Sequence, residues 1–174
     1  MSFPRPQLYI FIDWDETITT HDTLSLVAPP DSNEPNSPPP FSFFSEYYSQ
    51  AVVEHAKEFG PRDTLDRQLD YLASLAVVEN ATVAKAENEG LFKGVSETDI
   101  CERAKQVRFR DGWNEFADQV KEREHVRLMG ILSANWSTLF IRCALGRIHD
   151  DSLIEQLEIL ANVRSASCLL ITGC

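Results

Sequence analysis

The sequence is poor in positive charge. It contains 16 lysine and arginine residues against 27 aspartate and glutamate residues, a formal net charge of −11. Duplex nucleic acid and anionic membranes both favour partners with clustered Lys and Arg. We therefore expect no nucleic acid and no membrane as partner, whereas a divalent cation is compatible with the charge. An acidic surface that is simply solvated is the commoner explanation of such a composition.

The sequence also lacks a CxxC pair, a leader and a long apolar run. Its four cysteines show no metal-ligand spacing, so we expect free thiols packed as small core residues (Cys101, Cys143, Cys168 and Cys174). The N-terminus has neither the basic region nor the apolar stretch of a signal peptide. No stretch reaches the length of a transmembrane helix. These absences predict a cytoplasmic protein.

Three short apolar runs predict strands. Leu8–Ile12 is continuous and rich in β-branched and aromatic residues, which is typical of a strand buried on both faces of a parallel sheet. Arg127–Leu132 and Leu157–Ala161 have the same character. Between the first two lies a long stretch that begins with a proline-rich segment, residues 28–40, which predicts an exposed linker or insertion.

The rest of that stretch has helical periodicity. Apolar residues recur at helical spacing on both sides of a break at Gly60-Pro61 (Phe44, Tyr48 and Val52; Leu65, Leu69 and Leu72). Ser96 and Asp99 resemble a capping box that opens a further helix, and another is expected from Trp113. With 174 residues the chain suffices for a core with an inserted subdomain. We predict an α/β core, residues 1–20 and 109–174, with a helical cap, residues 21–108, inserted after the first strand.

Two polar loops follow strands of the predicted sheet. Asp13 and Asp15 come directly after the first strand, and Ser133 ends the second. Because ligands of open α/β sheets bind beyond the carboxyl ends of the strands, both loops are expected at one edge. A carboxylate can attack a phosphate ester and form an aspartyl-phosphate that water later cleaves. In this scheme Asp13 is the nucleophile and Asp15 donates and then accepts the proton.

The two loops resemble the motifs of the haloacid dehalogenase-like hydrolase superfamily. Residues 9–19, with Asp13-Trp-Asp15-Glu-Thr17, are similar to its first motif, an apolar strand followed by DxDxT. Residues 131–135 are similar to the second, an apolar strand that ends in Ser or Thr. Residues 108–113 resemble the segment that joins cap to core, and the insertion lies where the phosphoserine-phosphatase-like branch has its helical cap. The resemblance implies a Rossmann-like parallel core.

The resemblance also implies an activity and a site. The activity is a Mg²⁺-dependent phosphatase-like hydrolysis of a small phosphorylated metabolite through an aspartyl-phosphate intermediate. Catalysis falls to Asp13 and Asp15, which are also the implied Mg²⁺ ligands. The implied substrate- and phosphate-binding residues are Thr17, Asp22, Ser133, Ala134 and Asn135. The helix after Ser133 would favour an anion independently of the family, through its free amides and its dipole.

Two parts of the family's pattern are missing here. No lysine follows Ser133, and no Gly-Asp motif follows it at a strand end. Arg164 could supply positive charge, but a guanidinium is no direct replacement for an ammonium. We therefore expect an incomplete core, shortened at its C-terminus, and impaired activity. The alternatives are a non-catalytic binding or regulatory module of the same superfamily and a poorly stable chain without a function of its own. Taken singly, Asp15, Thr17 and Ser133 are more often capping or strand-end residues.

Overall fold

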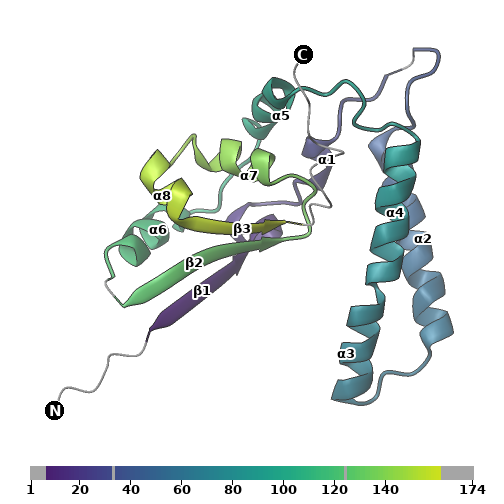
Figure 1. Cartoon of the computed structure of the whole chain (residues 1–174), viewed down its shortest axis with the longest axis horizontal. Helices are drawn as coiled ribbons and strands as arrows, with labels where there is room; N and C mark the ends of the chain where they lie inside the picture. The colour runs from purple at the N-terminus through teal and green to yellow at the C-terminus, as the bar shows by residue number, and fades with distance from the viewer. Residues whose placement is uncertain (1–6, 33, 124, 162–174) are drawn as a thin grey trace. The chain divides into compact units, whose positions relative to one another are not determined.

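The computed structural model describes residues 7–32, 34–123 and 125–161, and it divides the chain into two compact units (Figure 1). One unit combines the residues up to Val27 with those from Gly94 onward, and the other comprises Ala28–Lys93. Helices α1 (Leu24–Val27) and α5 (Glu97–Ala104) belong to the first unit, although the predicted cap, residues 21–108, includes them. The predicted division into domains stays a prediction.

The first unit contains a parallel sheet of three strands in the order β1-β2-β3. The strands are β1 (Leu8–Asp13), β2 (Val126–Ser133) and β3 (Leu157–Ala161), each where the sequence predicts one. An α/β fold is thereby confirmed in its coarse form. Asp13 is paired with Leu132 in register, so the carboxyl ends of β1 and β2 lie at the same edge.

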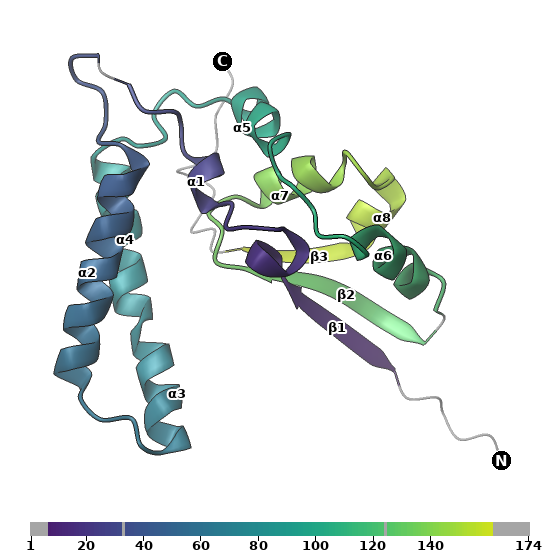
Figure 2. The ribbon, with the colours of Figure 1, turned by 180° about the vertical axis from the view of Figure 1, so that it is seen from behind.

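Helices cover one face of this sheet. Helices α6 (Trp113–Lys121), α7 (Thr138–Leu145) and α8 (Asp151–Gln156) lie together along one side of the strands, and Figure 2 shows the same layer from behind. The side chains between the two layers form the core of the unit, with Met129, Ile131, Phe140, Ile141, Leu157 and Ile159 buried. The sequence predicts α6 and α7 but not α8, because six residues carry too little periodicity.

The opposite face of the sheet remains largely exposed. Side chains alternate between faces along a strand, and the register places Phe11, Gly130 and Leu132 on this second face. Tyr9 is 55% exposed, Phe11 49% and Leu132 43%. The prediction that Leu8–Ile12 is buried on both faces is therefore wrong, because a buried strand requires covering layers on both sides.

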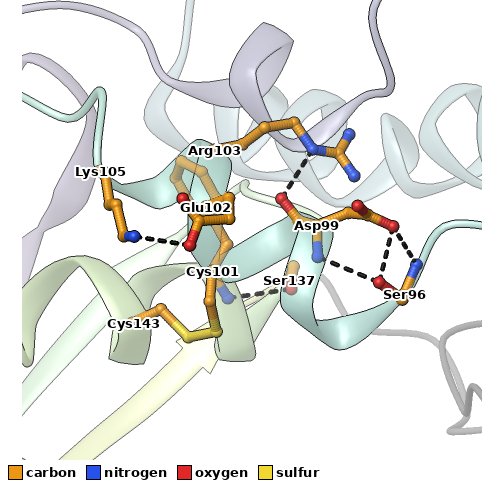
Figure 3. The surroundings of a disulfide bond; sticks show 9 residues. Ser96, Asp99, Cys101, Glu102, Arg103, Lys105, Ser137 and Cys143 are labelled. Atoms are coloured by element: carbon orange, nitrogen blue, oxygen red, sulfur yellow. Dashed lines mark hydrogen bonds and ion pairs between the residues drawn. A yellow bond between two sulfur atoms is a disulfide. The ribbon is translucent and has the colours of Figure 1, made fainter.

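Helix α5 packs on α7 and is well capped. The Ser96 hydroxyl accepts from the Asp99 amide, and the Asp99 carboxylate accepts from the Ser96 amide, which confirms the predicted capping box. A disulfide joins Cys101 of α5 to Cys143 of α7, with the two Cα atoms 5.2 Å apart (Figure 3). The expectation of free thiols is wrong for this pair. Cys168 and Cys174 lie outside the described residues.

The second unit is built from three helices. They are α2 (Phe41–Phe59), α3 (Leu65–Ser74) and α4 (Ala76–Asn88), and the break at Gly60-Pro61 falls between α2 and α3 as predicted. Gly60 ends α2 with a φ of +79°, a conformation that glycine adopts without strain. Phe44 and Tyr71 are buried here. The described part of residues 28–40 forms neither helix nor strand, as predicted.

The leucines of α3 do not face a core. Leu65, Leu69 and Leu72 share one helix face, but their exposed fractions are 73%, 54% and 52%. Periodicity correctly predicts the helix, and Tyr71, which no leucine spacing singles out, is its buried residue. Within the described residues, no helix is long and apolar enough to cross a membrane.

Candidate active site

Asp13 is the last residue of β1 and stands at the exposed edge of the sheet. The chain leaves it in a single wide turn, Trp14–Ile18 (η1), closed by the bond from the Thr19 amide to the Trp14 carbonyl, 3.1 Å. The Thr17 hydroxyl donates to Oδ2 of Asp13 across 3.1 Å. Asp13 is solvent-exposed. Its carboxylate is therefore held in place and remains open to a ligand from solvent.

Asp15 has a different environment, although only one residue separates it from Asp13. Its side chain is half-buried, and its Oδ1 accepts two hydrogen bonds from Thr23, 2.7 Å from the amide and 2.6 Å from the hydroxyl. Burial raises the pKa of the Asp15 carboxyl, the bonds from Thr23 oppose the rise, and the charges of Asp22 and Asp13 add to it. A carboxyl with a raised pKa suits a proton donor.

The turn after Asp13 is bonded to Phe109 and Arg110, in the segment that precedes α6. Thr19 forms an antiparallel bridge with Phe109, and the Arg110 amide donates to the Ile18 carbonyl, 2.9 Å. The Arg110 guanidinium donates to the Glu16 carbonyl, 2.6 Å. Glu16 has a φ of +58°, which is unusual for a residue with a side chain. These bonds stabilise the turn in that conformation.

Ser133 ends β2, next to the strand that carries Asp13. The Ser133 hydroxyl accepts from the Asn135 amide across 3.0 Å, so the loop closes on itself in a tight turn. Asn135 is fully buried and its Oδ1 accepts from the Ser137 amide, 3.1 Å. Ser137 then caps α7 by accepting from the Phe140 amide, 3.1 Å. The loop is thus rigidly built between β2 and α7.

Thr23 joins the two loops and is the residue that the sequence does not single out. Its hydroxyl accepts from Nε1 of Trp14, 2.9 Å, and from Nδ2 of Asn135, 3.2 Å, while it donates to Asp15. Thr23 and Asn135 lie 112 positions apart in the sequence. In the sequence, a threonine just before a helix is explained by helix capping alone. Only the fold reveals its bond to Asn135.

The other predicted site residues have plainer surroundings. Asp22 is exposed, and its Oδ1 accepts from the Leu24 amide across 2.7 Å, an Asx turn directly before α1. Ala134 is exposed between Ser133 and Asn135. The structure therefore brings Asp13, Asp15, Thr17 and Asp22 to one loop and the residues from Ser133 to Asn135 to the neighbouring one. Their roles in substrate binding stay predictions.

The two arginines described after Ser133, Arg142 and Arg147, bind backbone carbonyls. The Arg142 guanidinium donates to the Ile154 carbonyl, 3.1 Å, and that of Arg147 to the carbonyls of Ala104 and Val107, 3.2 and 3.0 Å. Both side chains fasten the helix layer. Arg164 lies outside the described residues. Among the described residues, none of the cations bonds to Asp13 in the position of the lysine that the sequence resemblance implies.

The residues at the sheet edge fit Mg²⁺ in part. Among residues 7–32, 34–123 and 125–161, no cluster of three or more His, Cys, Asp and Glu side chains could hold a metal. Mg²⁺, however, is commonly bound by one or two carboxylates together with waters and substrate phosphate. Asp13 offers an exposed carboxylate, whereas Oδ1 of Asp15 is already occupied by Thr23. The donor set fits a loosely held ion, centred on Asp13.

Comparison with known proteins finds a partial relative. A CTO1 family protein of Schizosaccharomyces pombe is 31% identical over 157 residues, which cover 89% of this chain and 55% of that protein. The chain thus spans about half the length of the relative that it matches. No family model matches the chain. The chain therefore accounts for only part of such a protein.

Proposed function

We propose that this chain is a phosphatase-like hydrolase of the haloacid dehalogenase-like type, acting on a small phosphorylated metabolite. The observation that carries the proposal is the contrast between its two aspartates. Asp13 is exposed at the end of β1, while Asp15 is half-buried, has a raised pKa and is bound by Thr23. Two carboxyl groups with opposite environments are what a nucleophile and an acid–base partner require.

The first step uses both aspartates. A carboxylate oxygen of Asp13 attacks phosphorus, the bond between phosphorus and the leaving oxygen breaks, and the proton of Asp15 passes to that oxygen. The product alcohol leaves and Asp13 carries the phosphoryl group. Thr17, bonded to Oδ2 of Asp13, orients the attacking carboxylate.

The second step restores the enzyme. Water attacks phosphorus, Asp15 accepts a proton from that water, and the bond between Asp13 and phosphorus breaks to release inorganic phosphate. The Ser133 hydroxyl and the amides of its loop are the groups proposed to bind phosphoryl oxygens, since they lie at the end of the neighbouring strand. A Mg²⁺ ion held by Asp13 would reduce the repulsion between carboxylate and phosphate, whereas Asp15, whose Oδ1 accepts two bonds from Thr23, serves here as the acid–base group.

The insertion after β1 is proposed to be a cap that selects the substrate, and the core to be of the Rossmann-like type. Support for the cap comes from the second compact unit, Ala28–Lys93. It has its own buried residues and lies between β1 and β2 in the sequence. Support for the core comes from three parallel strands with helices in the connections. We also propose that the protein acts in the cytoplasm.

A non-catalytic binding module is the second candidate. It is favoured by the engagement of Arg142 and Arg147 with backbone carbonyls, which leaves neither guanidinium bonded to Asp13 among the described residues. An aspartyl-phosphate without a nearby cation would be hard to form, whereas reversible binding of a phosphorylated ligand needs no covalent step. In this alternative Asp13 only binds.

One assay separates the two candidates. The purified chain is incubated with p-nitrophenyl phosphate and Mg²⁺, beside Asp13→Asn and a control, Asp63→Asn, whose carboxylate is exposed in the connection between α2 and α3. We expect turnover in the wild type and in the control and a loss to background in Asp13→Asn, because an amide is a poor nucleophile. Equal rates above background in all three proteins exclude the proposed nucleophile. If none turns over but beryllium fluoride with Mg²⁺ raises the melting temperature, the binding module is correct.

A further inference from the structure

The Thr23 hydroxyl is a saturated hydrogen-bonding centre. Thr23 is fully buried, and its hydroxyl donates to Oδ1 of Asp15 and accepts from Trp14 and Asn135. A hydroxyl has one proton to donate and two lone pairs to accept with. All three positions are used, so the direction of its O–H bond is determined by its partners.

Both bonds from Thr23 to Asp15 end on the same oxygen. The amide and the hydroxyl of Thr23 donate to Oδ1, 2.7 and 2.6 Å away. An oxygen that accepts two donated protons is a poor place for a third. When the carboxyl is neutral, its own proton therefore lies on Oδ2, the oxygen that Thr23 leaves free.

Nearby charges act against this position. The carboxylates of Asp13 and Asp22 both repel a negative Asp15. Repulsion between like charges favours conformers that hold them farther apart, unless hydrogen bonds oppose it. Thr23 supplies such bonds, and its hydroxyl is itself bonded by Trp14 and Asn135, which are fully buried.

We propose that Thr23 is a positioning residue, which turns the Asp15 carboxyl so that Oδ2 delivers its proton to the leaving oxygen, and which couples this loop to the one at Ser133. The inference rests on the proposed hydrolase function. It assigns no contact between Thr23 and substrate. The side-chain amide of Asn135 donates to the Thr23 hydroxyl, and its backbone amide donates to the Ser133 hydroxyl. These two bonds connect the loops.

The test compares substrates that differ in their need for a proton. The first substrate, phenyl phosphate, has a basic leaving oxygen that must be protonated. The second, 2,4-dinitrophenyl phosphate, releases 2,4-dinitrophenolate, which leaves without a proton. The ratio of kcat/KM for these two phosphate esters reports the first step and cancels the fraction of folded protein in a sample. It is measured for the wild type, Thr23→Val and Thr23→Ser, with Asp13→Asn as the blank.

We expect Thr23→Val to lower kcat/KM for phenyl phosphate by about 10²-fold, the usual contribution of a general acid, with little change for the dinitrophenyl ester. Thr23→Ser retains the hydroxyl and should keep the wild-type ratio. Thr23→Ala, which leaves room for a water, replaces the valine variant if that protein does not fold. An equal loss with both esters overturns the role of Thr23 and leaves the proposed function intact. Wild-type rates equal to those of Asp13→Asn overturn the function, and this inference with it.

Discussion

Strands β1 and β2 are neighbours of similar apolar character, yet their side chains are buried to different extents. On the face that the helices cover, Met129 of β2 is 6% exposed and Ile131 is fully buried, whereas their partners in β1, Ile10 and Ile12, are only partly buried. On the other face Tyr9 and Phe11 of β1 are about half exposed, 55% and 49%. The helix layer covers only one face of the sheet, and β1 is an edge strand of the described sheet. The difference shows that apolar sequence predicts a strand, but the elements packed on it determine its burial.

Exposure also differs between the proposed nucleophile, Asp13, and the residues proposed to position Asp15. Asp13, at the carboxyl end of β1, faces solvent, whereas Thr23 and Asn135 are fully buried. A nucleophile must be reached by its substrate. A positioning residue gains from burial, because a hydrogen bond away from water competes with fewer alternatives. The comparison of exposed and buried partners can be tested by substitution.

The largest effect is expected from truncation on the covered face of the sheet. Ile131→Ala removes a fully buried side chain and should lower the free energy of unfolding by about 2–5 kcal/mol. Phe11→Ala in the neighbouring strand should cost only about 1 kcal/mol, because its larger ring is already half exposed. Urea titration followed by circular dichroism measures both. Equal losses would mean that the outer face of the sheet is covered in solution.

The next effect concerns the helix layer that buries β2 and β3. Reduction of the Cys101–Cys143 disulfide, which closes a loop with a sequence separation of 42, should destabilise the protein by about 2–4 kcal/mol. Melting curves with and without dithiothreitol test this, and the double variant Cys101→Ser, Cys143→Ser should match the reduced wild type. Peptide mapping of the oxidised protein should find these two cysteines linked. Identical melting under both conditions, with both thiols free, would contradict the pairing.

The smallest effect concerns the cap of α8, the short helix on β3. Bonds from the Leu153 amide, the Ser152 hydroxyl and Lys121 lower the pKa of Asp150 to about 2. Because the folded pKa lies below the unfolded one, this stabilisation is complete above about pH 4 and is lost as the pH falls towards 2.

Asp150→Asn provides the matched comparison, since asparagine also caps helices but carries no charge. The wild type should melt a few degrees higher than Asp150→Asn at pH 5, and the gap should close towards pH 2. Melting curves at several pH values between these limits measure it. A gap that is independent of pH would show that the charge of Asp150 contributes nothing to the stability of this helix.

Much of the fold could be predicted from local sequence. The strands at Leu8, Arg127 and Leu157, the helix break at Gly60-Pro61 and the capping box at Ser96 and Asp99 all appear where expected. Each depends on neighbouring residues alone. The predictions that failed concern contacts over long distances, namely the outer face of β1 and the disulfide.

The candidate site divides in the same way. The sequence by itself determined that Asp13, Asp15 and Thr17 share one loop after a strand, because three residues within five positions cannot be far apart. Only the tertiary structure decided that Asp13 faces solvent while Asp15 is half-buried, and that Thr23 meets Asn135 from 112 positions away. Burial and such hydrogen bonds depend on which elements pack together, and no local pattern in a single sequence carries that information.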